Sequence, residues 1–499
     1  MSKKVNFSKI NLLSVILAVV MLIIVISCGG GGGGGGGIIP LIGGGGSSGG
    51  GSSPDISFNN QGYLIIETKS NSLNTSFLSF NFQTSNPNIL SNENNNINRN
   101  TLNNIREFRC GFKVSNKDNV NNNMLYSYST PNLNDTRNFQ VYDSATDNTV
   151  TVNAKCVYVN SNPKYAIWVD TNNTDNYNEE SLFNDNQANI INHFNHDYNT
   201  LTRNVGTLSF YVNVLITKKV DSRSNPEVIG YFWGSQDSQR VNVHPITLAD
   251  PNLNYGTYNE FNVTLAHEFV HLLEYNKTTI GNHSGWIAEG LATYGEELCG
   301  YFGDVRIDSI KSFFANPDTT PLVTDNPDFP NYGKSFLFIK QLDQRFTNAW
   351  ANMVKSNLDG ISLIENINGS EDFQTTVDKF NIAVLIDTND NNPTYDFIGL
   401  NLNSSTFYNG FNNGIYRYNG WKNTTLYNMG AANPMTEYSA YYLYKNSAFN
   451  GNILVNDIKL LFSNFVDNLV NGWNIKYDDN IKYDDFDGNS NVRFILLYK

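Results

Sequence analysis

The sequence predicts an α+β protein in which strands come first and a helical site follows. Short runs between residues 55 and 156, such as GYLIIET and NTVTVNAKCVYV, alternate apolar and polar side chains with the period of two that indicates β-strands. The stretches 264–276 and 332–346 place apolar residues at helical spacing instead. Strands followed by helices are typical of an α+β unit.

Composition and charge exclude several classes of protein. The chain has 499 residues, more than one ordinary core needs, so two or three domains are expected. Hydrophobic residues at 40% and aromatic residues at 13% exclude a disordered or fibrous protein. The net charge of −13 would repel a nucleic-acid backbone or an anionic membrane surface, so neither is expected as the main partner.

Residues 1–27 are predicted to be a signal peptide. Three lysines precede an apolar run at 12–26, which as a helix would span roughly 22 Å. That is short of the ~30 Å hydrocarbon layer of a bilayer. The residues before Cys28 resemble a bacterial lipobox, so we expect Cys28 to be lipidated and to anchor the chain to the cell envelope. Cleaved soluble export and an uncleaved anchor are the alternatives.

Residues 28–54 are almost wholly glycine and serine, apart from an apolar patch at 38–42. A flexible chain of this composition reaches roughly 30 Å and would act as a tether. Filler without a function is the alternative. If Cys28 carries lipid, three cysteines remain, and export permits a disulfide, which we expect between Cys110 and Cys156. Three buried free thiols are the alternative.

The rest of the chain divides into three expected parts. A β-rich module is expected at 55–155, and a site-bearing body at 156–392 contains strands such as KYAIWVD and EVIGYFWGS and a helix at 179–198. The strand EVIGYFWGS is either an edge that pairs with an extended substrate or an internal strand. Runs such as EYSAYYLYK and VRFILLYK predict a β-rich segment at 393–499.

The candidate site lies in TLAHEFVHLLEYN, which contains the motif H-E-x-x-H. His267 and His271 are four residues apart and therefore lie on one face of a helix, where both imidazoles can bind one metal ion. Glu268 lies beside such an ion, where its carboxylate can take a proton from water. A buried histidine pair bound to backbone carbonyls is the alternative interpretation.

A catalytic zinc needs three protein ligands, and Glu289 is the expected third. It lies in a second helical stretch, where Gly290 and Gly295 would permit close helix packing. Glu296, seven residues after Glu289, returns to the same face, where it could accept a hydrogen bond from a ligating histidine. An ordinary solvated carboxylate is the alternative for Glu296.

These residues resemble the gluzincin clan of zinc metallopeptidases, in which H-E-x-x-H is followed by a glutamate in a second helix. TLAHEFVHLLEYN, WIAEGLATYGEEL, VIGYFWGSQD and NYGKSFLFIKQLDQRF together resemble the hyicolysin family of bacterial secreted peptidases. The resemblance covers about 156–386 and implies a gluzincin-like domain with a mixed sheet. It also implies zinc on His267, His271 and Glu289, with Glu268 as general base.

The resemblance further implies a donor to the oxyanion of the tetrahedral intermediate. Tyr332, in YGKSF, matches the tyrosine that gluzincin aminopeptidases use, and His283 is the competing donor. Aromatic packing and an exposed loop histidine are the respective alternatives. Those aminopeptidases have asparagine where this chain has Ala288, and they carry a G-x-M-E-N element that this sequence lacks.

The sequence therefore predicts an exported, lipid-anchored zinc metallo-endopeptidase that hydrolyses peptide bonds with a metal-activated water. The expected partners are a protein or peptide substrate and, through lipid, the outer membrane or cell surface; otherwise the chain is secreted. A monomer is expected. The alternative is a non-catalytic surface lipoprotein, an adhesin or pseudopeptidase with a vestigial metal site.

Overall fold

The computed structural model has an α+β architecture, as the sequence predicts. It describes residues 128–143, 148–172, 178–220, 227–302, 304–315, 319–369, 371–387 and 391–402, together with 317, 438 and several short strands named below. The predicted signal peptide, Cys28 and the tether lie outside these residues. No helix in the part of the chain that the structure describes is both long and apolar enough to cross a membrane.

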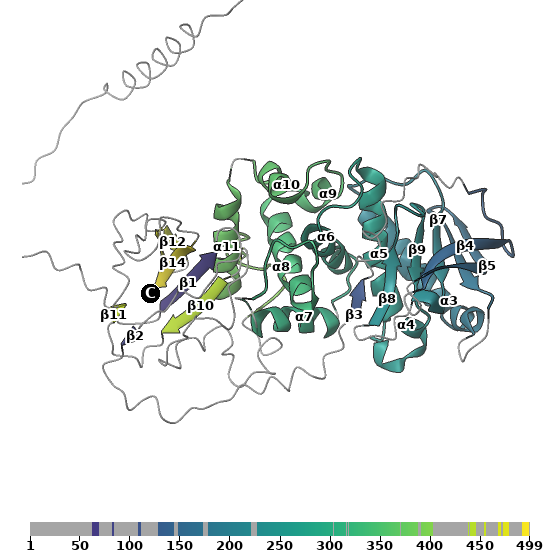
Figure 1. Cartoon of the computed structure of the whole chain (residues 1–499), viewed down its shortest axis with the longest axis horizontal. Coiled ribbons are helices and arrows are strands. Elements are labelled where there is room, and N and C mark those ends of the chain that lie inside the picture. The colour runs from purple at the N-terminus through teal and green to yellow at the C-terminus, as the bar shows by residue number, and fades with distance from the viewer. Residues whose placement is uncertain are drawn as a thin grey trace, which may run out of the picture. The chain divides into compact units, whose positions relative to one another are not determined.

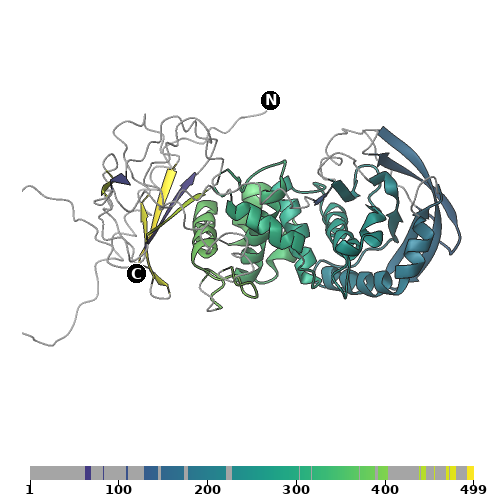
Figure 2. The same ribbon diagram turned by 90° about the horizontal axis from the view of Figure 1, so that it is seen from below.

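A curled seven-stranded mixed sheet forms one half of the main body (Figure 2). Its strand order is β3-β8-β9-β7-β6-β5-β4. The pairs β4–β5, β5–β6 and β8–β9 are antiparallel, whereas β6–β7, β7–β9 and β3–β8 are parallel. The strands are β3 (Phe108–Cys110), β4 (Thr136–Asp143), β5 (Asn148–Ser161), β6 (Lys164–Asp170), β7 (Val212–Ile216), β8 (Glu227–Phe232) and β9 (Arg240–Val243).

Two features of this sheet correct expectations from the sequence. Strand β5 runs across the expected boundary at 155/156, and both β4 and β5 belong to the main sheet, so the expected module at 55–155 and the expected body at 156–392 share one sheet. Strand β8, which corresponds to EVIGYFWGS, pairs with β9 on one side and with β3 on the other. It is therefore an internal strand rather than an edge.

Helices form the other half of the body. Figure 1 shows α5 between the sheet and the later helices, and α5 contacts both β8 and β9. The helix α3 packs against β6 and α5, and it runs one turn beyond its predicted end. The helices are α3 (Glu179–Thr202), α4 (Ile246–Ala249), α5 (Glu260–Lys277), α6 (Gly285–Leu298), α7 (Asp304–Ala315), α8 (Phe329–Arg345), α9 (Ala349–Val354), α10 (Gly360–Ile367) and α11 (Phe373–Ile386).

Side chains at the helix starts explain why the site-bearing helices begin where they do. The Asn259 side chain accepts a hydrogen bond from the backbone N–H of Asn262 and so caps α5. Asp328 and Asn331 form a reciprocal capping box at the start of α8, where Pro330 lies in the first turn. The helix α5 contains neither glycine nor proline, so it continues without a break through the motif to Lys277.

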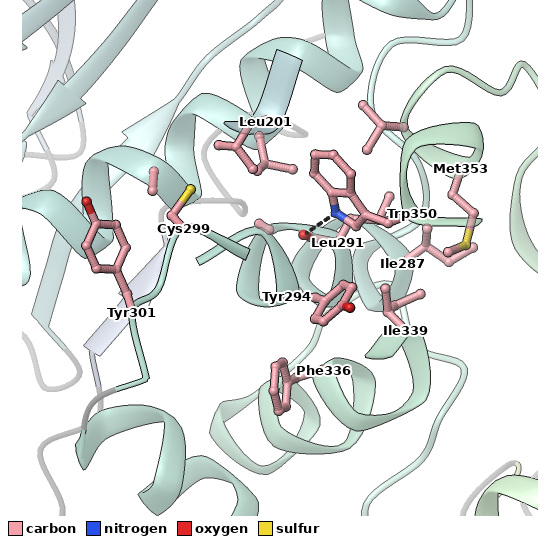
Figure 3. Packing of buried hydrophobic residues seen from close by; sticks show 14 of the residues in the cluster. Leu201, Ile287, Leu291, Tyr294, Cys299, Tyr301, Phe336, Ile339, Trp350 and Met353 are labelled. Atoms are coloured by element: carbon pink, nitrogen blue, oxygen red, sulfur yellow. Dashed lines mark hydrogen bonds between the residues drawn. The ribbon is translucent and has the colours of Figure 1, made fainter. Parts of the chain in front are cut away.

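Buried side chains of α6, α8 and α9 form the core beside the site (Figure 3). The indole Nε1 of Trp350 donates to the carbonyl oxygen of Leu291 at 3.0 Å. The helices approach closely at glycines: a Cβ on Gly295 would lie 2.6 Å from Val270 Cγ2 of α5, and one on Gly290 would lie 2.8 Å from Ile339 Cγ1 of α8. The sequence-based expectation for both glycines is therefore confirmed.

A second sheet joins segments from the two ends of the described chain. Its order is β10-β1-β14-β13-β12, and β1 pairs antiparallel with both β10 and β14. The predicted β-rich segments at 55–155 and 393–499 thus contribute strands to one sheet, while residues 391–402 pack with the helical core. The strands are β1 (Gly62–Thr68), β10 (Ala440–Lys445), β12 (Asn468–Val470), β13 (Trp473–Asp478) and β14 (Val492–Tyr498), and β2 (Phe82–Gln83) pairs separately with β11 (Leu454–Val455).

The expected disulfide between Cys110 and Cys156 is not formed, because Cys156 is a free, buried thiol. Its Sγ donates to the carbonyl oxygen of Tyr158 at 3.5 Å. Cys110 lies on β3 and Cys156 on β5, and four strands separate these two in the sheet. A disulfide needs Cα atoms within about 7 Å, which adjacent strands provide and strands so far apart do not. Cys299 is also a free, buried thiol.

Candidate metal centre

Two neighbouring helices carry the predicted ligands. His267 and His271 lie one turn apart on α5, and Glu289 lies on α6. The close approach at Gly295 holds α6 against α5, so that the three side chains face one another. All three residues are buried.

The three ligand atoms converge on one point. His267 Nε2 lies 3.0 Å from Glu289 Oε2 and 3.2 Å from His271 Nε2, and His271 Nε2 lies 3.8 Å from Glu289 Oε2. A tetrahedral zinc with bonds of about 2.0–2.1 Å separates its ligand atoms by about 3.3 Å. The observed spacings bracket this value.

The chemistry of the donor set also fits a metal. Two imidazoles and one carboxylate are a known ligand set of catalytic zinc. Glu289 Oε1 is buried and has no hydrogen-bond partner among the described residues, which is costly for a carboxylate unless a bound group compensates it. Within the described residues, this is the one group of histidine, cysteine and acidic side chains with metal-ligand spacing.

The pKa shifts of His267 and Glu289 indicate that the site favours a positive charge. Burial lowers the pKa of His267, but hydrogen bonds to Glu289 and Glu296 outweigh it and raise the pKa to about 10. Burial raises the pKa of Glu289, but hydrogen bonds from His267 and His271 outweigh it and lower the pKa to about 2. The carboxylate thus attracts a positive charge at the imidazole, which either a proton or a metal ion can supply.

Glu296 fixes the orientation of His267. His267 Nδ1 lies 2.6 Å from Glu296 Oε1, and the same carboxylate accepts hydrogen bonds from Arg306 on α7. A carboxylate paired with a guanidinium only accepts, so His267 Nδ1 carries the proton. The Nε2 atom of His267 is then the one that faces Glu289 and His271. Arg306 was not predicted from the sequence, because no helical spacing connects it to the motif.

The side chain of Glu268 projects from α5 towards strand β8 of the sheet. A Cβ on Gly230 of β8 would lie 3.2 Å from Glu268 Cγ and 2.3 Å from Thr264 Cγ2. Only glycine permits this approach of strand to helix, and it holds β8 against the side of α5 from which Glu268 projects. Gly230 was also missed from the sequence, although a glycine within a strand often marks such a contact.

The two candidate oxyanion donors differ in their surroundings. The ring of Tyr332, in the first turn of α8, stacks on the ring of His267 with centroids 6.3 Å apart. His283 is buried, and its Nδ1 and Nε2 atoms contact Glu274 Oε1 at 2.9 Å and the Ser356 carbonyl oxygen at 3.2 Å. His283 is therefore neither an exposed loop residue nor a free donor, and of the two candidates only Tyr332 is brought to the ligands.

The structure thus gathers His267, His271, Glu289, Glu296 and Tyr332 around one centre and leaves out His283, while Glu268 follows His267 on α5 and contacts β8 at Gly230. No protein-family model matches this sequence, and no curated protein matches it.

Proposed function

We propose that this chain is a zinc-dependent metallo-endopeptidase with a gluzincin-like catalytic domain. The observation that carries the proposal is the convergence of His267 Nε2, His271 Nε2 and Glu289 Oε2, with spacings of 3.0, 3.2 and 3.8 Å. These three residues would hold the ion. The order of the motif residues along the chain supports the gluzincin assignment, because the third ligand follows in a second helix.

The chain's own residues would perform the proton transfers. A bound zinc ion polarises a carbonyl group and makes water more acidic. The Glu268 carboxylate would take a proton from the attacking water and later deliver it to the leaving nitrogen. The Tyr332 hydroxyl would donate a hydrogen bond to the substrate oxygen as negative charge develops there.

An endopeptidase is favoured over an aminopeptidase. The chain has Ala288 immediately before Glu289 and contains no G-x-M-E-N sequence, whose glutamate would bind a free substrate amine. We therefore propose that the substrate is a protein, which the chain cleaves at internal peptide bonds. The lipobox-like residues before Cys28 support export and anchoring at a bacterial cell envelope.

Metal analysis and proteolysis of the purified chain test this proposal. We expect one zinc per chain, and cleavage of casein that a chelator abolishes and added zinc restores. Glu268→Gln should keep the zinc and lose turnover by about 10²–10⁴-fold, because the amide cannot accept the proton. The hydrolase proposal fails if the wild-type chain binds zinc but cleaves nothing, or if Glu268→Gln remains as active as the wild type.

A further inference from the structure

Arg306 connects the helix α7 to the proposed metal ligand His267 through Glu296. Its side chain is 11% exposed, and it comes from α7, outside both ligand-bearing helices. Its Nη2 donates to Glu296 Oε1 at 2.6 Å, and its Nε donates to Glu296 Oε2. The guanidinium therefore binds both oxygens of one carboxylate, an arrangement that fixes the plane of the carboxyl group.

The Glu296 carboxylate has no freedom to turn while this contact exists. Glu296 is fully buried, and its Oε1 accepts from Arg306 and also lies 2.6 Å from His267 Nδ1. A rotation that broke the contact with His267 would also break the charge-assisted bonds to Arg306. Arg306 therefore acts on the direction of the His267 ring through Glu296, whose Oε1 atom both residues contact.

We propose that Arg306 is a positioning residue for the metal centre: through Glu296, it aims His267 Nε2 at the point where the three ligand atoms meet. This inference rests on the metal site of the proposed function. Without Arg306, Glu296 would keep one strong partner and could adopt other rotamers, so His267 would spend part of its time misaligned. Loss of a partner that is hydrogen-bonded to a metal ligand typically weakens metal binding by about 10–100-fold, and the loss of Arg306 would have this effect through Glu296.

A purely structural role is the competing explanation, because a buried ion pair also ties α7 to α6. The ion pair of the next residue of α6, Glu297, with Lys340 of α8 provides a matched control. Lys340 Nζ of α8 lies 2.7 Å from Glu297 Oε1, with side chains 5% and 20% exposed. This pair also joins α6 to a neighbouring helix, but in the described structure no hydrogen bond connects it to His267, His271 or Glu289.

The experiment compares Arg306→Gln, Arg306→Lys and Lys340→Gln in the full chain. Zinc affinity of the metal-free protein is measured by competition with a chelator, and stability is measured separately by urea unfolding. We expect Arg306→Gln to weaken zinc binding by about 10–100-fold. Arg306→Lys should restore part of this loss, because an ammonium supplies the charge but not the two-point contact. Lys340→Gln should lose stability without losing zinc affinity.

Three results would overturn the inference. One is an Arg306→Gln protein that binds zinc as tightly as the wild type. Another is an equal loss of affinity in Lys340→Gln, which would show a general effect of instability. If Arg306→Gln does not fold, Arg306→Lys decides, and unchanged zinc affinity in that variant would count against the proposal.

Failure of the proposed function gives a different result, since a chain that binds zinc without cleaving casein leaves the comparison of zinc affinities intact. A wild-type chain that binds no zinc overturns both.

Discussion

At the scale of single residues, Tyr332 separates packing from chemistry. Its ring stacks on His267, and its hydroxyl is the proposed donor to the substrate oxygen. Tyr332→Phe keeps the ring and removes the hydroxyl. We expect kcat to fall by about 10²–10³-fold, the usual cost of losing one oxyanion donor, with zinc content and KM nearly unchanged. Steady-state kinetics on a defined peptide measure this, and an unchanged kcat would leave Tyr332 with a packing role only.

The residues of the site that the sequence predicts are those related by helical spacing. His267 and His271 differ by four positions and Glu289 and Glu296 by seven, so each pair lies on one helix face whatever the rest of the fold does. Arg306 and the partners of His283 could not be predicted in this way. Their contacts join separate elements, and the sequence gives no register between one helix and another.

At the scale of elements, the contact between α6 and α8 depends on Gly290. A Cβ there would lie 2.8 Å from Ile339 Cγ1 and 3.0 Å from the backbone oxygen of Ser335, and backbone cannot move aside cheaply. For Gly290→Ala, overpacking costs about 1–3 kcal/mol and the gain in helix propensity returns about 1 kcal/mol. We expect a net loss of about 1 kcal/mol in the free energy of unfolding by urea. A more stable variant would mean that the helices separate easily.

The sequence predicts which segments form strands better than it predicts how those strands pair. Alternation identified β1 and β5 as strands, because a half-buried strand needs an apolar face. It did not show that β4 and β5 join β6, or that β1 pairs with β14 from the opposite end of the chain. Pairing depends on complementary faces brought together by the whole fold, and local pattern carries no information about the partner.

At the scale of the whole molecule, the predicted anchor can be tested apart from the catalytic body. If Cys28 is lipidated, Cys28→Ser should move the protein from the membrane fraction of the producing bacterium to the soluble fraction, because the acyl chains are lost. Detergent extraction followed by immunoblotting measures this. Casein cleavage per zinc should be unchanged, since the site lies more than two hundred residues away in the sequence. A variant that stayed in the membrane fraction would show that another segment provides the anchor.

The stability of the body is expected to fall in mild acid because of His244. This residue follows β9, and its Nδ1 accepts from the backbone N–H of Ile246 at 3.0 Å, which requires the neutral ring. Burial lowers its pKa from 6.5 to about 4. Since the folded-state pKa lies below the unfolded one, the contribution is complete above pH 6.5 and is lost as the pH falls towards 4, by about 3 kcal/mol at most.

The matched variant for this acid effect is His244→Asn, whose side-chain oxygen can accept from Ile246 without titrating. Urea unfolding between pH 7 and pH 4 should give a shallower pH dependence in the variant than in the wild type. His283 acts in the opposite sense: burial lowers its pKa, but the contact with Glu274 outweighs this and raises it, so its contribution is complete below its unfolded pKa and is lost as the pH rises through the raised folded value. That contribution is present in both proteins and cancels in the difference. Identical slopes would mean that His244 is not buried as a neutral ring.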